Sequence, residues 1–275
     1  MKFIESFTNE GMLQSLNSKA SRRDSFSQFG KMGATAAMAA VPFSMLFSQK
    51  ANAASAAAFM ATAAAETPTE ALQLALTLEY LEDEFYKTAL DTDGFLTGTD
   101  RTIITQIAKH ESAHVSLLRT TLGNNAPAKP TFDFTAGGNF NDVFTNRATF
   151  LAVAQAFEDT GVRAYKGQAG NITDKDILTV ALQIHSVEAR HASQIRRLRG
   201  LKGWIPGNDE GGHPAQADAV YAGENVTTQA GFNTASVNAG SGNPAIPASA
   251  GSESFDEPIT GTQARAIATL FIRPS

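Results

Sequence analysis

The sequence predicts an all-α protein built around a four-helix bundle, and three observations support this prediction. A motif of carboxylates and imidazoles occurs twice, apolar residues recur at helical spacing around both copies, and a long stretch containing Pro and Gly separates them. Each copy combines a Glu-x6-Tyr unit with a later Glu-x-x-His unit. The first copy comprises Glu79, Tyr86, Glu111 and His114, and the second comprises Glu158, Tyr165, Glu188 and His191. Two similar helical hairpins are therefore expected.

Capping and turn residues place the four helices along the chain. The first is expected to begin at the capping box 67–70, with Thr67 as the cap, and to end near Leu90. The second and third are expected at about 99–122 and 147–169. A short turn at Gly170-Asn171 then leads to a fourth helix that Thr173 caps and that ends near Leu198.

Two further segments have a different composition. Residues 124–146 contain two prolines and a Gly-Gly pair and are longer than a hairpin needs, so we expect the long crossover of a bundle with parallel middle helices. From Gly200 onward the chain is rich in Gly, Asn, Pro, Ser and Ala, which predicts an irregular extension. A short final helix is expected at about 260–271, packing on the bundle or on a neighbouring subunit, with a disordered tail as the alternative.

The Glu-x-x-His spacing has a direct geometric meaning. Three residues advance about 300° around a helix, which leaves the Glu and the His on one face, one turn apart. Two packed hairpins then bring four glutamates and two histidines together, which is the inventory of a dinuclear metal site. Oxygen and nitrogen ligands suit two iron or manganese ions per chain, and zinc is left open. The predicted metal ligands are Glu79, Glu111, His114, Glu158, Glu188 and His191.

A solvated helix face is the alternative interpretation, because Glu-x-x-His is common on exposed helices. Here the flanking residues are apolar, including Ile104 and Ile107 beside the first unit and Ile184 and Ile195 beside the second. Carboxylates buried at matched places without a counter-charge would be costly, which favours shared cations. For the neighbouring run 82–84 (Glu-Asp-Glu), a solvated face is the default. His110 and His185 are either donors to the ligands or packing residues.

These paired motifs resemble those of the ferritin-like di-metal carboxylate superfamily, which includes bacterioferritin, rubrerythrin and manganese catalase. The resemblance covers about residues 67–200. Segments 220–229 and 254–258 of the tail further resemble exported bacterial ferritin-like proteins that are called desiccation-related.

The resemblance implies a role for each predicted ligand. Glu79 and Glu158 would be terminal carboxylates, the two glutamates of the Glu-x-x-His units would bridge, and each histidine would supply one nitrogen. Several relatives carry an Asp directly before each Glu-x-x-His, whereas this chain has His110 and Val187 there. The groups that orient the ligands must therefore differ, and such groups tune metal affinity.

Composition excludes several classes of partner and cofactor. A net charge of −5 with only 22 Lys and Arg among 275 residues argues against a nucleic-acid partner. The absence of cysteine excludes disulfides, thiolate metal sites and a rubredoxin-type iron centre. Metal ions and a small oxidant are the expected partners, and a homo-oligomer is left open.

The first 53 residues resemble a twin-arginine signal peptide. Arg22-Arg23 precedes a mildly apolar stretch, and Ala51-Asn52-Ala53 is an A-x-A cleavage site. The apolar stretch is about 15 residues long and contains Pro42, which is short of the roughly 20 residues that span a bilayer. We therefore expect export to the periplasm or cell surface. The expected domains are 1–53 (signal), 54–200 (bundle) and 201–275 (extension).

Two function classes are consistent with these predictions. The first is an oxidative-stress enzyme whose di-iron or di-manganese centre reacts with peroxide or oxygen, as a peroxidase, catalase or ferroxidase. The second is a non-catalytic, exported stress or surface protein that binds metal for stability. An iron-storage cage is disfavoured, because the long tail after the fourth helix would have to fit a closed shell.

Overall fold

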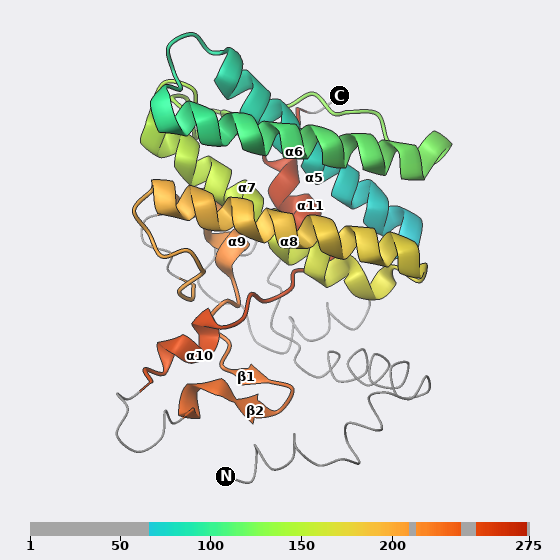
Figure 1. Ribbon diagram of the computed structural model, residues 1–275, viewed down its shortest axis with the longest axis vertical. Helices are drawn as coiled ribbons and strands as arrows, with labels where there is room; N and C mark the ends of the chain where they lie inside the picture. Colours follow the sequence, from blue (N-terminus) through green and yellow to red (C-terminus); the bar gives the residue numbers. More distant parts are fainter. Residues whose placement is uncertain (1–65, 209–212, 238–245, 274–275) are drawn as a thin grey trace. The chain divides into compact units, whose positions relative to one another are not determined.

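Four long helices dominate the computed structural model, which describes residues 66–208, 213–237 and 246–273 (Figure 1). They are α5 (Pro68–Asp91), α6 (Gly98–Leu122), α7 (Arg147–Gln168) and α8 (Lys175–Leu198). α5 packs along α6, α7 packs along α8, and α5 also contacts α7. The predicted all-α class and helical bundle are confirmed, and the helix ends closely match those expected from the sequence.

The two predicted N-terminal caps had different outcomes. Thr67 forms the expected capping box, because its hydroxyl accepts from the Glu70 amide at 3.2 Å and the Glu70 carboxylate accepts from the Thr67 amide at 2.8 Å. The predicted Thr173 cap is wrong. Asp174 caps α8 instead, accepting from the backbone amides of Asp176 and Ile177. A carboxylate is as good a cap as a hydroxyl and also interacts favourably with the helix dipole.

The crossover between α6 and α7 begins with a 3-10 turn, η2 (Gly123–Asn125), and then lines the core. Its side chains Phe132, Phe134 and Phe140 are buried. Backbone hydrogen bonds join it to the C-terminal end of the chain, from the Asp133 amide to the Phe271 carbonyl at 2.7 Å and from the Arg273 amide to Thr131. The long crossover is thus part of the core and not a loose loop.

Aromatic side chains fill the core between α5 and α7. Phe85 is fully buried, stacks on Phe150 at 5.0 Å between ring centroids and meets Phe157 edge to face at 5.0 Å. Phe271 meets Phe157 in the same way at 4.7 Å. Such pairs stabilise beyond the area they bury and have specific geometry. They fix the register between α5 and α7, on which the centre of the bundle depends.

A 3-10 turn, η3 (Ala169–Asn171), lies between α7 and α8. After α8, the described part of the chain is loop-rich and contains only short elements. They are η4 (Ala215–Ala217), α9 (Asp218–Tyr221), β1 (Thr228–Gln229), β2 (Phe232–Asn233), η5 (Thr234–Ser236), α10 (Ser249–Glu253) and α11 (Gly261–Thr269). β1 and β2 pair antiparallel. α11 confirms the predicted final helix and packs on α5 and α7 through Ala264, Ile267 and Ala268.

Two buried ion pairs lie where this extension meets the bundle: Arg163–Glu224 joins α7 to the extension, and Arg196–Asp159 joins α8 to α7. Arg163 is 1% exposed, and its Nε lies 2.8 Å from Glu224 Oε1 while its guanidinium also donates to the carbonyls of Val220 and Ala222. Arg196 lies 2.5 Å from Asp159, which also accepts from the Tyr221 hydroxyl at 2.8 Å. Buried charges of this kind are tolerated only when they are paired and hydrogen-bonded.

The predicted signal segment, residues 1–53, lies outside the described residues. Within the part of the chain that the structure describes, no helix combines the length and the apolar character that crossing a membrane requires.

We expect Arg163→Met to lower the free energy of unfolding by roughly 3–5 kcal/mol, because the Glu224 carboxylate would stay buried without its partner. Urea denaturation of the full chain, followed by circular dichroism, measures this change. The control is Lys129→Met, which removes an exposed ion pair with Glu84 and should cost less than about 1 kcal/mol. Equal costs for the two variants would contradict the role of Arg163.

Candidate metal centre

All six predicted ligands meet in the middle of the bundle. Each of the four helices contributes, because α5 carries Glu79, α7 carries Glu158, and α6 and α8 each carry one Glu-x-x-His unit. The four glutamates are 0% exposed. The ligand atoms form two groups, each within 4.8 Å, consisting of Glu79, Glu111, His114 and Glu188, and of Glu111, Glu158, Glu188 and His191. Glu111 and Glu188 therefore belong to both groups.

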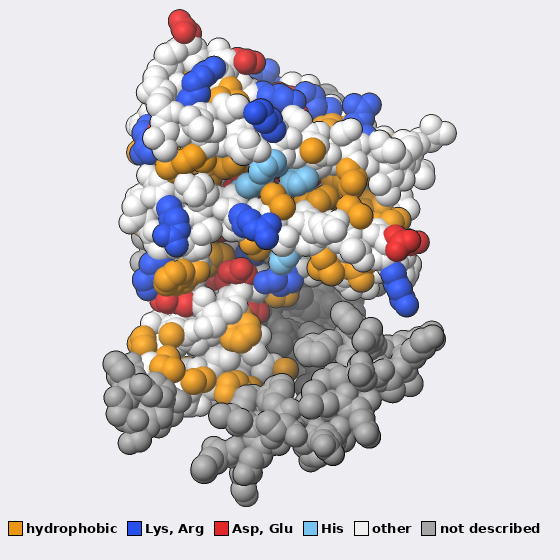
Figure 2. Space-filling model, viewed as in Figure 1, with side chains coloured by type: hydrophobic (Ala, Val, Ile, Leu, Met, Phe, Trp, Pro, Cys, Tyr) orange, Lys and Arg blue, Asp and Glu red, His pale blue; other side chains and the backbone are white. Residues whose placement is uncertain are grey.

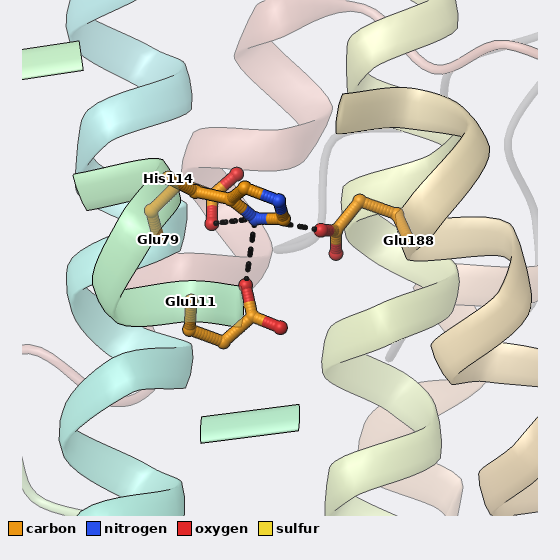
Figure 3. Close-up of side chains that lie close together, drawn as sticks. All are labelled: Glu79, Glu111, His114 and Glu188. Carbon is orange, nitrogen blue, oxygen red and sulfur yellow. Dashed lines mark hydrogen bonds and ion pairs between the residues drawn. The ribbon is translucent and has the colours of Figure 1, made fainter. Parts of the chain in front are cut away.

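His114 is the centre of the first group. Its Nδ1 lies 3.1 Å from Glu79 Oε2, 3.1 Å from Glu111 Oε2 and 3.2 Å from Glu188 Oε1. Figure 3 shows these side chains pointing toward one another from α5, α6 and α8. The three carboxylates come from three helices, so the group exists only when both hairpins are packed together.

His191 is the centre of the second group. Its Nδ1 lies 2.8 Å from Glu111 Oε1, 3.3 Å from Glu158 Oε2 and 3.9 Å from Glu188 Oε1. Both histidines thus face the carboxylates through Nδ1. The two carboxylates that the groups share could bridge two cations, while Glu79 and Glu158 would each serve one.

The two Glu-x6-Tyr units are crossed between the helices. The Tyr86 hydroxyl of α5 donates to Glu158 Oε1 of α7 at 2.5 Å, and the Tyr165 hydroxyl of α7 donates to Glu79 Oε1 of α5 at 2.5 Å. The two pairs, Glu79 with Tyr165 and Tyr86 with Glu158, are arranged as expected for antiparallel helices in register. Each phenol leaves the other oxygen of its carboxylate directed at a histidine.

Several buried ligand atoms have no well-formed hydrogen bond, although some lie within ion-pair distance of a histidine. Among the described residues these atoms are Glu111 Oε1, Glu158 Oε2, both carboxylate oxygens of Glu188 and His191 Nδ1. Buried polar atoms are normally satisfied, and those left without a partner are costly. All of these atoms carry lone pairs when deprotonated, so cations between them would satisfy them together. The residues present therefore fit a dinuclear metal centre.

The carboxylates raise the basicity of both histidines. Burial lowers the pKa of His114, but the close carboxylates of Glu111, Glu188 and Glu79 outweigh burial and raise the pKa to about 12. Burial likewise lowers the pKa of His191, and the charge of Glu158 with the other carboxylates raises it to about 11. Without metal, both imidazoles are therefore cationic at neutral pH.

The carboxylates themselves divide into two kinds. Burial raises the pKa of Glu111, but the close imidazoles of His114 and His191 outweigh burial and lower the pKa to about 2. Burial raises the pKa of Glu79 to about 8, although His114 donates to it. Burial, followed by the charge of Glu111, raises the pKa of Glu188 well above its ordinary value. The cluster therefore holds more carboxylate than its two imidazoles can neutralise.

Glu82 is a member of this cluster that sequence reasoning missed. The expected solvated face is wrong for Glu82, which is 2% exposed, and for Asp83, which is 8% exposed. Oxygens of Glu82 and Glu188 lie 3.4 and 3.2 Å from the position that a Cβ on Gly161 would take. Burial and the charge of Glu188 raise the pKa of Glu82 well above its ordinary value. Glu82 and Asp83 are buried because α5 packs against both α6 and α7, and these two contacts cover more of the surface of α5 than a contact with α6 alone would.

The sequence does contain a signal for Glu82. It lies three residues after Glu79, the same spacing that places Glu and His on one face in the Glu-x-x-His units. The matching position after Glu158 is Gly161, whose missing side chain leaves room for the Glu82 carboxyl group.

The two other histidines had different outcomes. His110 contacts a ligand, because its Nδ1 lies 2.8 Å from His191 Nε2. His185 contacts none: its Nε2 is buried without a hydrogen-bond partner among the described residues, and its pKa is lowered by burial and by the charge of Lys166.

Comparison with known proteins agrees with this geometry. A family model described as a ferritin-like domain matches residues 67–201, which span α5 to α8 and include all six predicted ligands. No curated protein matches the chain.

We expect the metal-free protein to lose stability as the pH rises from 6 to 9. Glu79 has a folded pKa of about 8 against an ordinary pKa of 4.5, so its ionisation above pH 4.5 opposes folding. The histidines stabilise the fold fully below their ordinary pKa of 6.5, and that contribution is lost as the pH rises toward 11 or 12. Glu111 has the opposite sign, but its effect is confined to pH below about 4.5. Thermal unfolding at a series of pH values measures the slope.

Two controls test whether the cluster causes this slope. Added Mn²⁺ should remove most of it, because ligation stabilises the deprotonated groups. Glu82→Gln should reduce it without removing any of the six predicted ligands, since it removes a buried carboxyl group with a raised pKa. A metal-free protein whose stability is unchanged between pH 6 and 9 would contradict the assigned electrostatics.

Proposed function

Because residues 67–201 belong to the ferritin-like superfamily, we propose that this domain holds a dinuclear iron or manganese centre that reacts with hydrogen peroxide or dioxygen. The observation that carries the proposal is the pair of ligand groups that share Glu111 and Glu188. Two cations bound this way would each have one histidine and one terminal carboxylate. Oxygen-rich ligation with one nitrogen per ion favours iron or manganese over soft metals.

A bound pair of such ions would supply redox equivalents and a Lewis-acidic site for a small oxidant. The protein's own residues prepare that site in three ways. Tyr86 and Tyr165 fix the orientation of the terminal carboxylates through their hydroxyl groups. Burial raises the pKa of both phenols well above the ordinary value. Each phenol therefore stays protonated and donates a hydrogen bond to its carboxylate. The aromatic core around Phe85 excludes bulk water from this end of the cluster.

Peroxide is the favoured oxidant within this proposal. Its disproportionation into water and dioxygen needs no outside electron donor, whereas continuous reduction of dioxygen does. The chain contains no cysteine, so it has no thiolate-bound iron centre to deliver electrons. The same argument makes catalase-like turnover the simplest activity to test.

We further propose that the protein is exported to the periplasm or cell surface through its twin-arginine segment. The support is the sequence of residues 21–53, which contains Arg22-Arg23 and the site Ala51-Asn52-Ala53. Export after folding would allow the metal to be bound in the cytoplasm, before exposure to competing ions outside. The narrower resemblance to desiccation-related proteins is consistent with this location and stays a prediction.

We expect protein loaded with iron or manganese to consume hydrogen peroxide faster than the same concentration of free metal. Glu111→Ala should lower the bound metal below two ions per chain and abolish consumption, because both ligand groups contain Glu111. Elemental analysis and oxygen evolution measure the two effects. Glu84→Ala is the control on α5, because Glu84 pairs with Lys129 and belongs to neither group.

The outcomes separate the two function classes. Two ions per chain in Glu111→Ala would show that the ligand assignment is wrong. Full metal occupancy in the unaltered protein, with neither peroxide loss nor ferrous oxidation above free metal, would support the alternative of a non-catalytic exported stress or surface protein.

We expect replacement of both Arg22 and Arg23 by Lys to leave the precursor in the cytoplasm, because the arginine pair is the recognition element of this pathway. The exported protein should begin at Ala54. Cell fractionation and N-terminal sequencing measure both results. Lys19→Arg, a basic substitution outside the pair, is the control and should be exported normally. Normal export of the double variant would contradict the pathway.

A further inference from the structure

His191 differs from His114 in what its second ring nitrogen contacts. His191 Nδ1 faces the carboxylates, and its Nε2 lies 2.8 Å from Nδ1 of His110. The two rings are within 10° of parallel, with centroids 5.1 Å apart. A 2.8 Å contact at that separation places the rings edge to edge, which is the geometry of an N–H···N hydrogen bond. The contact joins α6 to α8, which belong to different hairpins.

Ligation determines which nitrogen carries each proton. If His191 binds a cation through Nδ1, its remaining proton must be on Nε2. Nε2–H can then donate to the lone pair of His110 Nδ1, and His110 carries its own proton on Nε2. The side-chain amide of Gln106 lies 2.8 Å from that atom, and a half-turn of the amide presents its oxygen as the acceptor. One consistent set of protons therefore connects Gln106, His110 and His191.

The other half of the site cannot form this link. The position that matches His110, directly before the second Glu-x-x-His unit, is Val187, which has no hydrogen-bonding side chain. Among the described residues, the hydrogen bonds and ion pairs of His114 all involve Nδ1. The side chain of His114 is also more exposed than that of His191, at 11% against 5%. Figure 2 shows histidine side chains reaching the surface on the face formed by α6 and α8.

We infer that His110 is a positioning residue for His191 and makes the two metal positions unequal. This inference rests on the proposed dinuclear centre. A partner on the second nitrogen fixes the tautomer and orientation of a ligating histidine and raises the basicity of the ligating nitrogen. The position formed by Glu158 and His191 therefore binds the first metal ion, and the position formed by Glu79 and His114 binds the second more weakly. Loss of such a partner typically costs about 10–100-fold in metal affinity.

The test is a titration of metal-free protein with Co²⁺, followed by its visible absorption. The unaltered protein should bind two ions in two separate steps. His110→Phe, which keeps a ring but removes the acceptor, should weaken the tighter step by about 10–100-fold and leave the weaker step unchanged. His110→Asn, whose side-chain oxygen can replace Nδ1, should restore most of the affinity. Val187→Ala is the matched control in the other half and should change neither step.

A second measurement reports on the hydrogen bond itself. In Zn²⁺-loaded protein, nitrogen-correlated NMR spectra of the histidine rings should show a slowly exchanging Nε2 proton on His191, which His110→Phe loses. Equal affinities in the unaltered protein, equal weakening of both steps, or a rapidly exchanging His191 proton would overturn the inference. The NMR result on the unaltered protein applies even if His110→Phe does not fold. Failure of the unaltered protein to bind two ions would instead contradict the proposed function.

Discussion

The burial of more carboxylate than imidazole is the constraint on which the rest of this structure depends. Five glutamates, Glu79, Glu82, Glu111, Glu158 and Glu188, lie within the bundle and face two histidines. Like charges held together in a medium of low polarity repel strongly, so some of these groups must stay protonated or be neutralised by cations. Burial first, and then the like charges of neighbouring carboxylates, raise the pKa of Glu79, Glu82, Glu158 and Glu188. A bundle without this cluster would be more stable as an apolar core, which is why the cluster indicates function.

α7 shows how the fold meets that constraint. Every residue from Phe150 to Tyr165 is buried, so this helix has no solvent-facing side. Glu158 faces the cluster. The next residue, Asp159, pairs with Arg196 of α8 and accepts from the Tyr221 hydroxyl of the extension, while Arg163 pairs with Glu224 of the extension. The same helix therefore carries the ligand on one side and the extension's anchors on the other. The extension after α8 is thereby part of what holds α7, and hence Glu158, in place.

The sequence was sufficient for the helices and for the six predicted ligands to be located together, because a repeated Glu-x-x-His inside an apolar stripe indicates two packed hairpins. It was not sufficient wherever the answer depended on how the helices pack. The sequence predicts a solvated face for Glu82, because the burial of α5 on a second side comes from its contact with α7. The crossed pairing of Tyr86 with Glu158 depends on the register between two helices, which spacing within one helix does not determine. The Arg163–Glu224 pair joins distant segments and leaves no local pattern.

The two halves of the site depart from symmetry at two matched positions, and both departures have chemical consequences. Glu82 in α5 corresponds to Gly161 in α7, which adds a carboxyl group to one side. His110 in α6 corresponds to Val187 in α8, which gives His191 a hydrogen-bonding partner. A duplicated hairpin with identical halves would form two equivalent metal positions. An incoming oxidant would then meet the same surroundings at both. In the proposed dinuclear centre, these differences would make the two metal positions unequal in charge environment and in ligand orientation, so that binding and reaction would begin at one defined position.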